Sequence, residues 1–174
     1  SSGLHSNGIS LARRILFNQW GGKYAPDDVP EGLEREVVLE ALEPTRIYVK
    51  PFLRVAEEIS VKAVVHITGD AYLKFNKLTK FSRGIGFEFN NFKPHPIFAL
   101  IQKTAKLLKG TLTDEEMFKT FNMGWGFAIV AEKAAAEKAI EILNKVGGQA
   151  ELIGQIRDTE GVRIQCKNRK ILLK

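Results

Sequence analysis

Hydrophobic residues recur at helical spacing in several stretches of the chain. The stretch nearest the start shows this most simply, because Ile9, Ala12 and Ile15 follow the 3.6-residue period and two glycines close the pattern at residues 21–22. Near the middle, Thr113 stands three residues before a glutamate, which is a capping-box pattern. The same criteria predict helices over residues 8–18, 34–42, 52–59, 96–108, 113–120 and 134–146.

Strands are predicted where apolar and β-branched residues cluster or alternate over short runs. Residues 61–68 form a largely apolar run typical of a buried strand, whereas residues 75–81 fit neither period. The strands expected are residues 47–49, 61–68, 85–89, 127–131, 150–156, 162–167 and 171–173. Because helices and strands are interspersed without regular βαβ alternation, we predict the α+β class, with a mixed β-sheet covered by helices.

The composition fits one globular domain. The chain has 174 residues, 44% hydrophobic and 26% charged, close to the average for folded proteins. The longest apolar run, residues 127–131, is far shorter than the roughly 20 residues of a membrane span, so we expect no membrane partner. The single cysteine, Cys166, excludes an internal disulfide and fits a reducing compartment, so we expect a cytoplasmic protein.

The net charge of +6 leaves two classes of partner open, nucleic acid and an anionic metabolite. A non-enzymatic nucleic-acid module would present a basic face and bind with an affinity that falls steeply with salt. The basic residues are instead spread along the chain, and the basic tail at residues 167–174 contains no aromatic residue for base stacking. We therefore expect no nucleic acid.

A polar segment with two glycines, Ser-Ser-Gly-Leu-His-Ser-Asn-Gly, opens the chain at residues 1–8. The helix that follows offers unpaired N–H groups and a partial positive charge, which suit a phosphate or another anion. The alternative is that Ser6 or Asn7 simply caps this helix. Capping does not explain His5 or the two glycines, which permit close approach of the backbone to a ligand.

Two further polar segments adjoin predicted strands. His-Ile-Thr-Gly-Asp at residues 66–70 ends the apolar run, and ligands collect at such strand ends in α/β sheets. The alternative for a lone histidine such as His66 is a satisfied place in the core. At residues 121–127, two glycines at a strand start imply tight backbone packing or a bulge, and packing around the strand entry accounts for the aromatic residues. The role of Asn122 in this segment stays open.

The sequence predicts no metal site. His5, His66 and His95 are far apart in the sequence and lack paired cysteines. No P-loop, serine elbow or His-Glu-x-x-His motif is present. Taken alone, the residues indicate an anion-binding α+β domain.

The polar segments stand in the order of one family's motifs, at residues 1–8, 42–51, 66–69, 96–98, 115–124 and 153–154. With these stretches the chain resembles the C-terminal domain of aminoimidazole ribonucleotide synthetase, the phosphoribosylformylglycinamidine cyclo-ligase of purine synthesis. The resemblance spans essentially all 174 residues. The stretches at 42–51 and 115–124 are more particular to this enzyme, and the first stretch is shared across a superfamily.

The resemblance implies ATP-dependent closure of an imidazole ring. His5 and His66 would be the catalytic residues that handle protons in the cleft. Substrate and phosphate would be bound by Ser2, Gly3, Ser6, Asn7, Gly8, Thr68 and Gly69.

The resemblance also implies a larger enzyme. Residues 1–174 would be its C-terminal, substrate-side domain, and an N-terminal ATP-binding domain would lie outside this sequence. That domain would supply most of the ligands for ATP and Mg²⁺, so we expect no cofactor on this chain alone and no activity from it alone. The expected partners are formylglycinamidine ribonucleotide, the N-terminal domain and, in the full enzyme, a second copy forming a homodimer.

The chain departs from the family pattern after residue 69. Two glycines usually follow there, whereas this chain has Asp70, Ala71 and Tyr72, and the usual Asn…Pro-Arg is missing from residues 74–78. A substrate contact made by this loop is therefore in doubt. The alternative function is another ATP-dependent member of the superfamily, of the formylglycinamidine synthetase, thiamine-phosphate kinase, selenophosphate synthetase or hydrogenase-maturation type.

Overall fold

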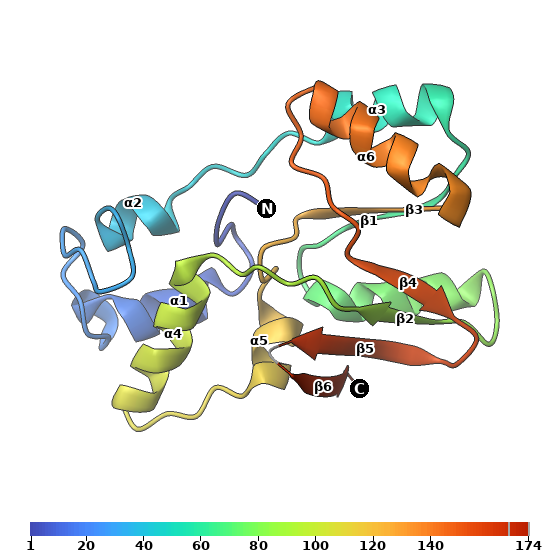
Figure 1. Ribbon diagram of the computed structural model, residues 1–174. Coiled ribbons are helices and arrows are strands. Elements are labelled where there is room, and N and C mark those ends of the chain that lie inside the picture. Colours follow the sequence, from blue (N-terminus) through green and yellow to red (C-terminus); the bar gives the residue numbers. More distant parts are fainter. Residues whose placement is uncertain (167, 174) are drawn as a thin grey trace.

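Helices form where the sequence shows the helical period. The computed structural model describes residues 1–166 and 168–173 (Figure 1). Its α-helices are α1 (Ile9–Leu16), α2 (Val37–Ala41), α3 (Val49–Glu58), α4 (Pro96–Leu107), α5 (Asp114–Thr120) and α6 (Ala136–Lys145), with short 3-10 helices η1 (Asn18–Trp20), η2 (Ala71–Lys80) and η3 (Lys133–Ala135). The predicted capping box is confirmed, because Thr113 Oγ1 accepts from the N–H of Glu116 and the Glu116 carboxylate accepts from the N–H of Thr113.

The strand predicted at residues 47–49 is wrong. Val49 is the first residue of α3, and Tyr48 precedes it with helical backbone angles. Pro51 fits in the first turn of this helix, where its missing N–H would have no partner. Residues 75–81, which fitted neither period, lie mostly in η2.

The strands form two sheets (Figure 1). β1 (Val61–His66) and β3 (Phe127–Ala131) pair antiparallel, whereas the second sheet has the order β4 (Gly154–Arg157), β2 (Gly86–Phe89), β5 (Gly161–Cys166) and β6 (Arg169–Leu173). In this sheet β2 and β5 are parallel and the other pairs are antiparallel. The α+β class and the mixed sheet are thus confirmed, while the division into two sheets was not predicted. Lys167, the end of one predicted strand, lies outside the described residues.

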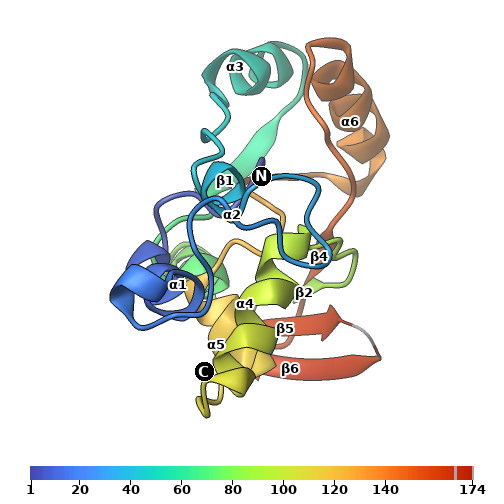
Figure 2. The ribbon, with the colours of Figure 1, turned by 90° about the vertical axis from the view of Figure 1, so that its left-hand side faces the viewer.

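The main core lies between the four-stranded sheet and the helices. The rings of Phe75 and Phe89 pack edge to face with centroids 4.7 Å apart, and Tyr72 lies against Phe89 at 5.5 Å. A smaller cluster joins α3 and α6 to the two-stranded sheet. Figure 2 shows this helix pair at one end of the molecule, with β1 beneath it. Among the described residues, none of the helices is long and apolar enough to span a membrane.

Candidate functional site

Three segments that are distant in the sequence meet at one place, which we call the loop junction: residues 1–8, 66–69 and 122–126. The pairing of β1 with β3 brings the last two together. Beyond the strand ends, the N–H of Ile67 donates to the carbonyl of Gly126 at 2.9 Å. The polar segments at the end of β1 and the start of β3 are therefore direct neighbours.

The opening loop lies against both of these segments. The α-amino group of Ser1 donates to the carbonyl of Gly124 at 2.6 Å. A Cβ atom placed on Gly69 would lie 3.7 Å from Oδ1 of Asn7. The structure therefore brings together the three polar segments that the sequence singled out.

Asn122 anchors the opening loop to the rest of the fold. Its side chain is only 2% exposed and uses all its hydrogen-bonding groups. Nδ2 donates to the carbonyls of Gly3 and Leu4 at 2.8 and 3.1 Å. Oδ1 accepts from the Ser1 hydroxyl at 2.8 Å and from the Gly124 N–H at 2.9 Å. The role that the sequence left open for Asn122 is thus a positioning role.

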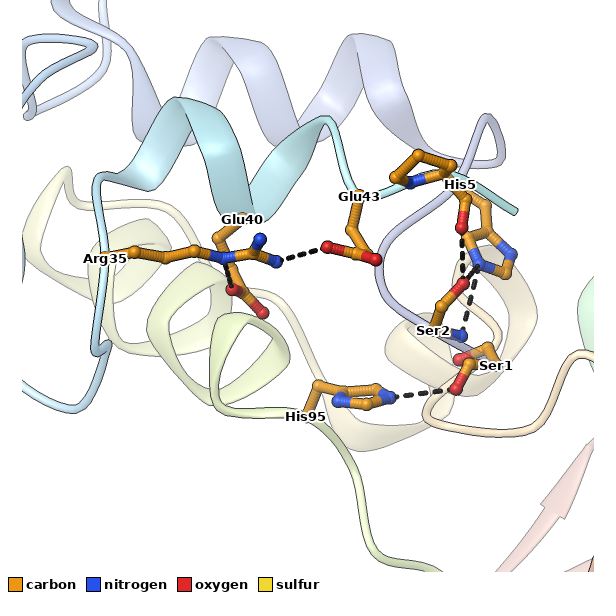
Figure 3. A network of polar contacts seen from close by, with 8 residues as sticks. Ser1, Ser2, His5, Arg35, Glu40, Glu43 and His95 are labelled. Carbon is orange, nitrogen blue, oxygen red and sulfur yellow. Dashed lines mark hydrogen bonds and ion pairs between the residues drawn. The ribbon is translucent and has the colours of Figure 1, made fainter. Parts of the chain in front are cut away.

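His5 lies on this anchored loop with its ring against Ser2 (Figure 3). Its backbone is left-handed, with φ 62°. The Ser2 hydroxyl lies 2.8 Å from His5 Nε2 and 2.6 Å from the carbonyl of Pro44. The backbone N–H of Ser2 donates to His5 Nε2 at 3.4 Å. The two contacts with Ser2 hold the imidazole in place on the loop.

The surroundings of His5 keep its ring neutral. Burial lowers the pKa of His5 to about 4, and the positive charges of the Ser1 amine, His66, His95 and Arg46 lower it further. Desolvation and like charges both disfavour the imidazolium ion. At neutral pH the imidazole of His5 is therefore available as a proton acceptor and does not act as an imidazolium acid.

His66 lies at the exposed end of β1, not in the core as the structural alternative supposed. Its ring meets Tyr48 edge to face at 5.6 Å and lies 6.2 Å from the ring of Phe127. Burial and then the charge of Lys74 lower the pKa of His66. The ammonium of Lys74 donates to the Thr68 hydroxyl and, at 3.2 Å, to the carbonyl of His66.

The start of α1 has no side-chain cap. Gly8 is the N-cap residue, with φ 71°, so the alternative that Ser6 or Asn7 caps the helix is wrong. Ser6 is exposed, and only its carbonyl accepts from the N–H of Ile9, at 3.3 Å. A Cβ atom on Gly8 would press on the ring of Phe121, so glycine lets the loop pass close to α5. Phosphate binding by this loop stays a prediction.

Four residues at the loop junction were missed by sequence reasoning, which named none of them as a site residue. Arg46 and Tyr48 stand in the stretch 42–51 that carried the resemblance, so that stretch held a usable signal. Lys74 stands in the divergent segment after β1. His95 was considered only as a metal ligand, whereas its Nε2 lies 3.1 Å from the carbonyl of Ser1 (Figure 3).

Comparison with known proteins places this geometry in a family. The family model "AIR synthase related protein, C-terminal domain" matches residues 1–167. Phosphoribosylformylglycinamidine cyclo-ligases of Methanococcus maripaludis, Methanocaldococcus jannaschii and a Geobacillus species are similar to the chain at 41%, 41% and 39% identity. The matches cover 99%, 91% and 93% of this chain and 47%, 43% and 45% of the relatives. The chain thus spans about half the length of these curated relatives.

Solved structures agree on the fold. The crystal structure of E. coli HypE matches with a TM-score of 0.57 at 21% identity, covering 99% of this chain and 48% of that one. HypE in the HypE–HypF complex matches with a TM-score of 0.55 at 18% identity, covering 99% and 50% of the two chains. The family model and the cyclo-ligase relatives together cover nearly every residue of the chain. The chain therefore belongs to the family of AIR synthase related proteins, whose C-terminal domain it represents.

Proposed function

We propose that this chain is the C-terminal half of a phosphoribosylformylglycinamidine cyclo-ligase, the purine-biosynthesis enzyme that closes the imidazole ring of formylglycinamidine ribonucleotide with ATP. The observation that carries the proposal is the loop junction, where the stretches 1–8 and 66–69 meet around a neutral histidine. Relatives named for this activity, at 39–41% identity, support it. The HypE structures share the fold at lower identity, so they favour no second function.

The reaction needs an activated carbon and a base. ATP phosphorylates the formyl oxygen of the substrate and leaves as ADP. An amidine nitrogen then attacks the activated carbon, the C–O bond to phosphate breaks, and the nitrogen loses a proton. A neutral imidazole near that nitrogen suits the last step. We assign it to His5, with His66 as the second candidate.

The opening loop would hold the phosphate of the substrate. The backbone of Ser2-Gly3 and of Ser6-Asn7-Gly8 precedes α1, whose first N–H groups and dipole favour an anion. Thr68 and Gly69 would face the same substrate from the end of β1. The space beside Gly69, where an added Cβ would lie 3.7 Å from Oδ1 of Asn7, supports a shared surface.

Partners and cofactors follow from the same proposal. In the residues that the structure describes, no group of three or more His, Cys, Asp and Glu side chains could hold a metal. An N-terminal domain would supply the ligands for ATP and Mg²⁺, and the full enzyme would be a cytoplasmic homodimer. The matches to only half of each relative support a second domain.

The test uses the longest natural chain that carries these 174 residues. Conversion of formylglycinamidine ribonucleotide to aminoimidazole ribonucleotide is measured with ATP, for the natural chain and for a variant with His5→Ala and His66→Ala together. The surface variant Arg54→Gln is the control, because the ion pairs of Arg54 in the described part of the chain are with Glu57 and Glu58 on its own helix α3. Turnover lost in the double variant alone supports the assignment. Full turnover in the double variant would overturn the roles of both histidines.

A further inference from the structure

Arg46 is a cation at the loop junction that no acidic side chain neutralises. Its guanidinium donates to the neutral amide of Gln149 at 2.7 Å, and none of the ion pairs found among residues 1–166 and 168–173 includes it. Its charge lowers the pKa of three junction groups, the Ser1 amine, His5 and Tyr48. Arg46 is therefore close to the same place as His5, although it comes from a different loop.

The nearest acid in the sequence is held elsewhere. Glu43 stands three residues before Arg46, but its carboxylate accepts from Arg35 at 2.6 Å. Arg35 also binds Glu40 at 2.7 Å, so these three residues form a separate network (Figure 3). The positive charge of Arg46 thus stays available at the junction. An arginine that lies beside uncharged polar groups and has no carboxylate partner is typical of a site for an anion.

A buried hydroxyl without a partner lies beside this charge. Tyr48 Oη is shielded from solvent and makes no hydrogen bond in the part of the chain that the structure describes. A buried hydroxyl left unpaired costs stability, which is a reason to look for an absent ligand. Burial raises the pKa of Tyr48, so the hydroxyl is a protonated donor at neutral pH.

Gly126 holds this hydroxyl next to the opening loop. A Cβ atom on Gly126 would clash with Tyr48 Oη and would lie 3.3 Å from Cα of Ser1. Only the absence of a side chain at residue 126 lets the phenol reach this point. The Tyr48 hydroxyl and the Ser1 backbone therefore share one small space at the loop junction.

We infer that Arg46 and the Tyr48 hydroxyl bind a phosphate group at the loop junction, beside the opening loop. Arginine offers a planar fork of donors that matches a phosphate, and the phenol adds one more donor. The inference rests on the proposed function for the source of that group. It is the 5′-phosphate of the ribonucleotide or the inorganic phosphate released on ring closure, and both present negatively charged phosphate oxygens at neutral pH.

Binding is measured by calorimetry on the longest natural chain, with inorganic phosphate and ribose 5-phosphate as separate probes. Loss of a charge-assisted contact predicts that Arg46→Gln weakens binding about ten- to a hundredfold, and that Tyr48→Phe weakens it about three- to tenfold. If these variants weaken the binding of ribose 5-phosphate alone, the site is assigned to the ribonucleotide. If they weaken the binding of inorganic phosphate alone, it is assigned to the released product. Unchanged binding of both probes in Arg46→Gln overturns the inference.

The matched control is Gln149→Ala. Gln149 is exposed and accepts the hydrogen bond from Arg46, so this variant removes the contact between the two loops and keeps the charge. If Arg46 only tethers the loops, Gln149→Ala weakens phosphate binding as much as Arg46→Gln does, which also overturns the inference. We expect wild-type binding in Gln149→Ala and partial rescue in Arg46→Lys.

Turnover separates this inference from the proposed function. If the natural chain converts formylglycinamidine ribonucleotide and Arg46→Gln raises KM at nearly constant kcat, both stand. If the natural chain has no such activity but Arg46→Gln still loses phosphate binding, the site stands and the proposed function fails. If turnover is present and neither binding nor KM changes in Arg46→Gln, the function stands and the site fails.

Discussion

Asn122 and Gly3 are 119 residues apart in the sequence and are joined by a hydrogen bond of 2.8 Å from the side-chain amide to the carbonyl. The same amide reaches Leu4, and the backbone carbonyl of Asn122 accepts from the buried hydroxyl of Tyr72 at 2.6 Å. Through Tyr72 the contact continues into the aromatic core around η2. The position of the opening loop, and of His5 on it, is therefore fixed by the core of the domain.

We expect Asn122→Ala to lower the free energy of unfolding by about 3 kcal/mol, because it leaves buried backbone groups unpaired. The groups affected are the carbonyls of Gly3 and Leu4 and the N–H of Gly124. Urea denaturation measures the change. Asn144→Ala is the matched control: Asn144 also bridges backbone groups, at Ala150, but it is exposed, so water replaces its contacts. Equal losses in the two variants would contradict the anchoring role.

Much of the local structure could be predicted because it depends on neighbouring residues. The capping box at Thr113 is one example, since both of its bonds lie within one helical turn. The prediction of a strand at residues 47–49 was wrong, because the apolar side chains of Ile47 and Tyr48 do not belong to a strand. Ile47 is 80% exposed, and Tyr48 stacks on Phe127 with centroids 5.2 Å apart. A short apolar run does not distinguish a strand from a surface that packs on another element.

The site was predicted in part, and the missing part has a physical cause. His5, His66 and the glycines were singled out by local motifs, and the structure places them together. Arg46 and Lys74 were missed because a lone basic residue in a basic chain does not by itself indicate a site, although the stretch 42–51 around Arg46 carried the resemblance. Their importance depends on which carboxylates are near, and that is decided by pairings such as Arg35 with Glu43.

The stability of the domain should fall as the pH is lowered through the range in which His5 titrates. The pKa of His5 is about 4 in the folded state, against 6.5 for a free side chain. Between these values the unfolded chain binds the proton more readily, so the free energy of unfolding rises with pH. The stability that the neutral His5 contributes is therefore lost as the pH falls from about 6.5 towards 4. Melting temperatures between pH 5 and 7 test this.

The pKa of His66 is also lowered, so His66 contributes to the pH dependence of stability in the same direction as His5. The variant His5→Gln removes the contribution of His5 and leaves that of His66. We expect a flatter pH dependence in this variant than in the wild type. Parallel curves for the two proteins across this range would show that His5 is not held neutral by the fold.

The start of α1 should not tolerate a side chain at Gly8. Gly8→Ala places a methyl group in a left-handed backbone with φ 71° and 2.8 Å from Cγ2 of Thr120. Gly21→Ala is the matched control, because φ is 90° there but no atom lies within 4 Å of the added Cβ. We expect a loss of about 1 kcal/mol for Gly21→Ala from backbone strain alone, and about 3 kcal/mol for Gly8→Ala, where crowding adds to it. Similar losses by urea denaturation would exclude the crowding.

Lys74 should control the protonation of His66. Its ammonium donates to the carbonyl of His66 and lowers the pKa of the imidazole, after the effect of burial. Lys74→Met removes the charge and keeps most of the side-chain volume, so the pKa of His66 should rise. NMR titration of the imidazole signals measures this shift.

Lys77→Met is the matched control, since Lys77 lies 3.6 Å from Asp70 and does not act on His66. If Lys77→Met shifts the pKa of His66 as far as Lys74→Met does, the effect comes from the net charge of η2 and not from the contact. A shift in Lys74→Met alone would show that η2 supplies a charge to the loop junction through Lys74.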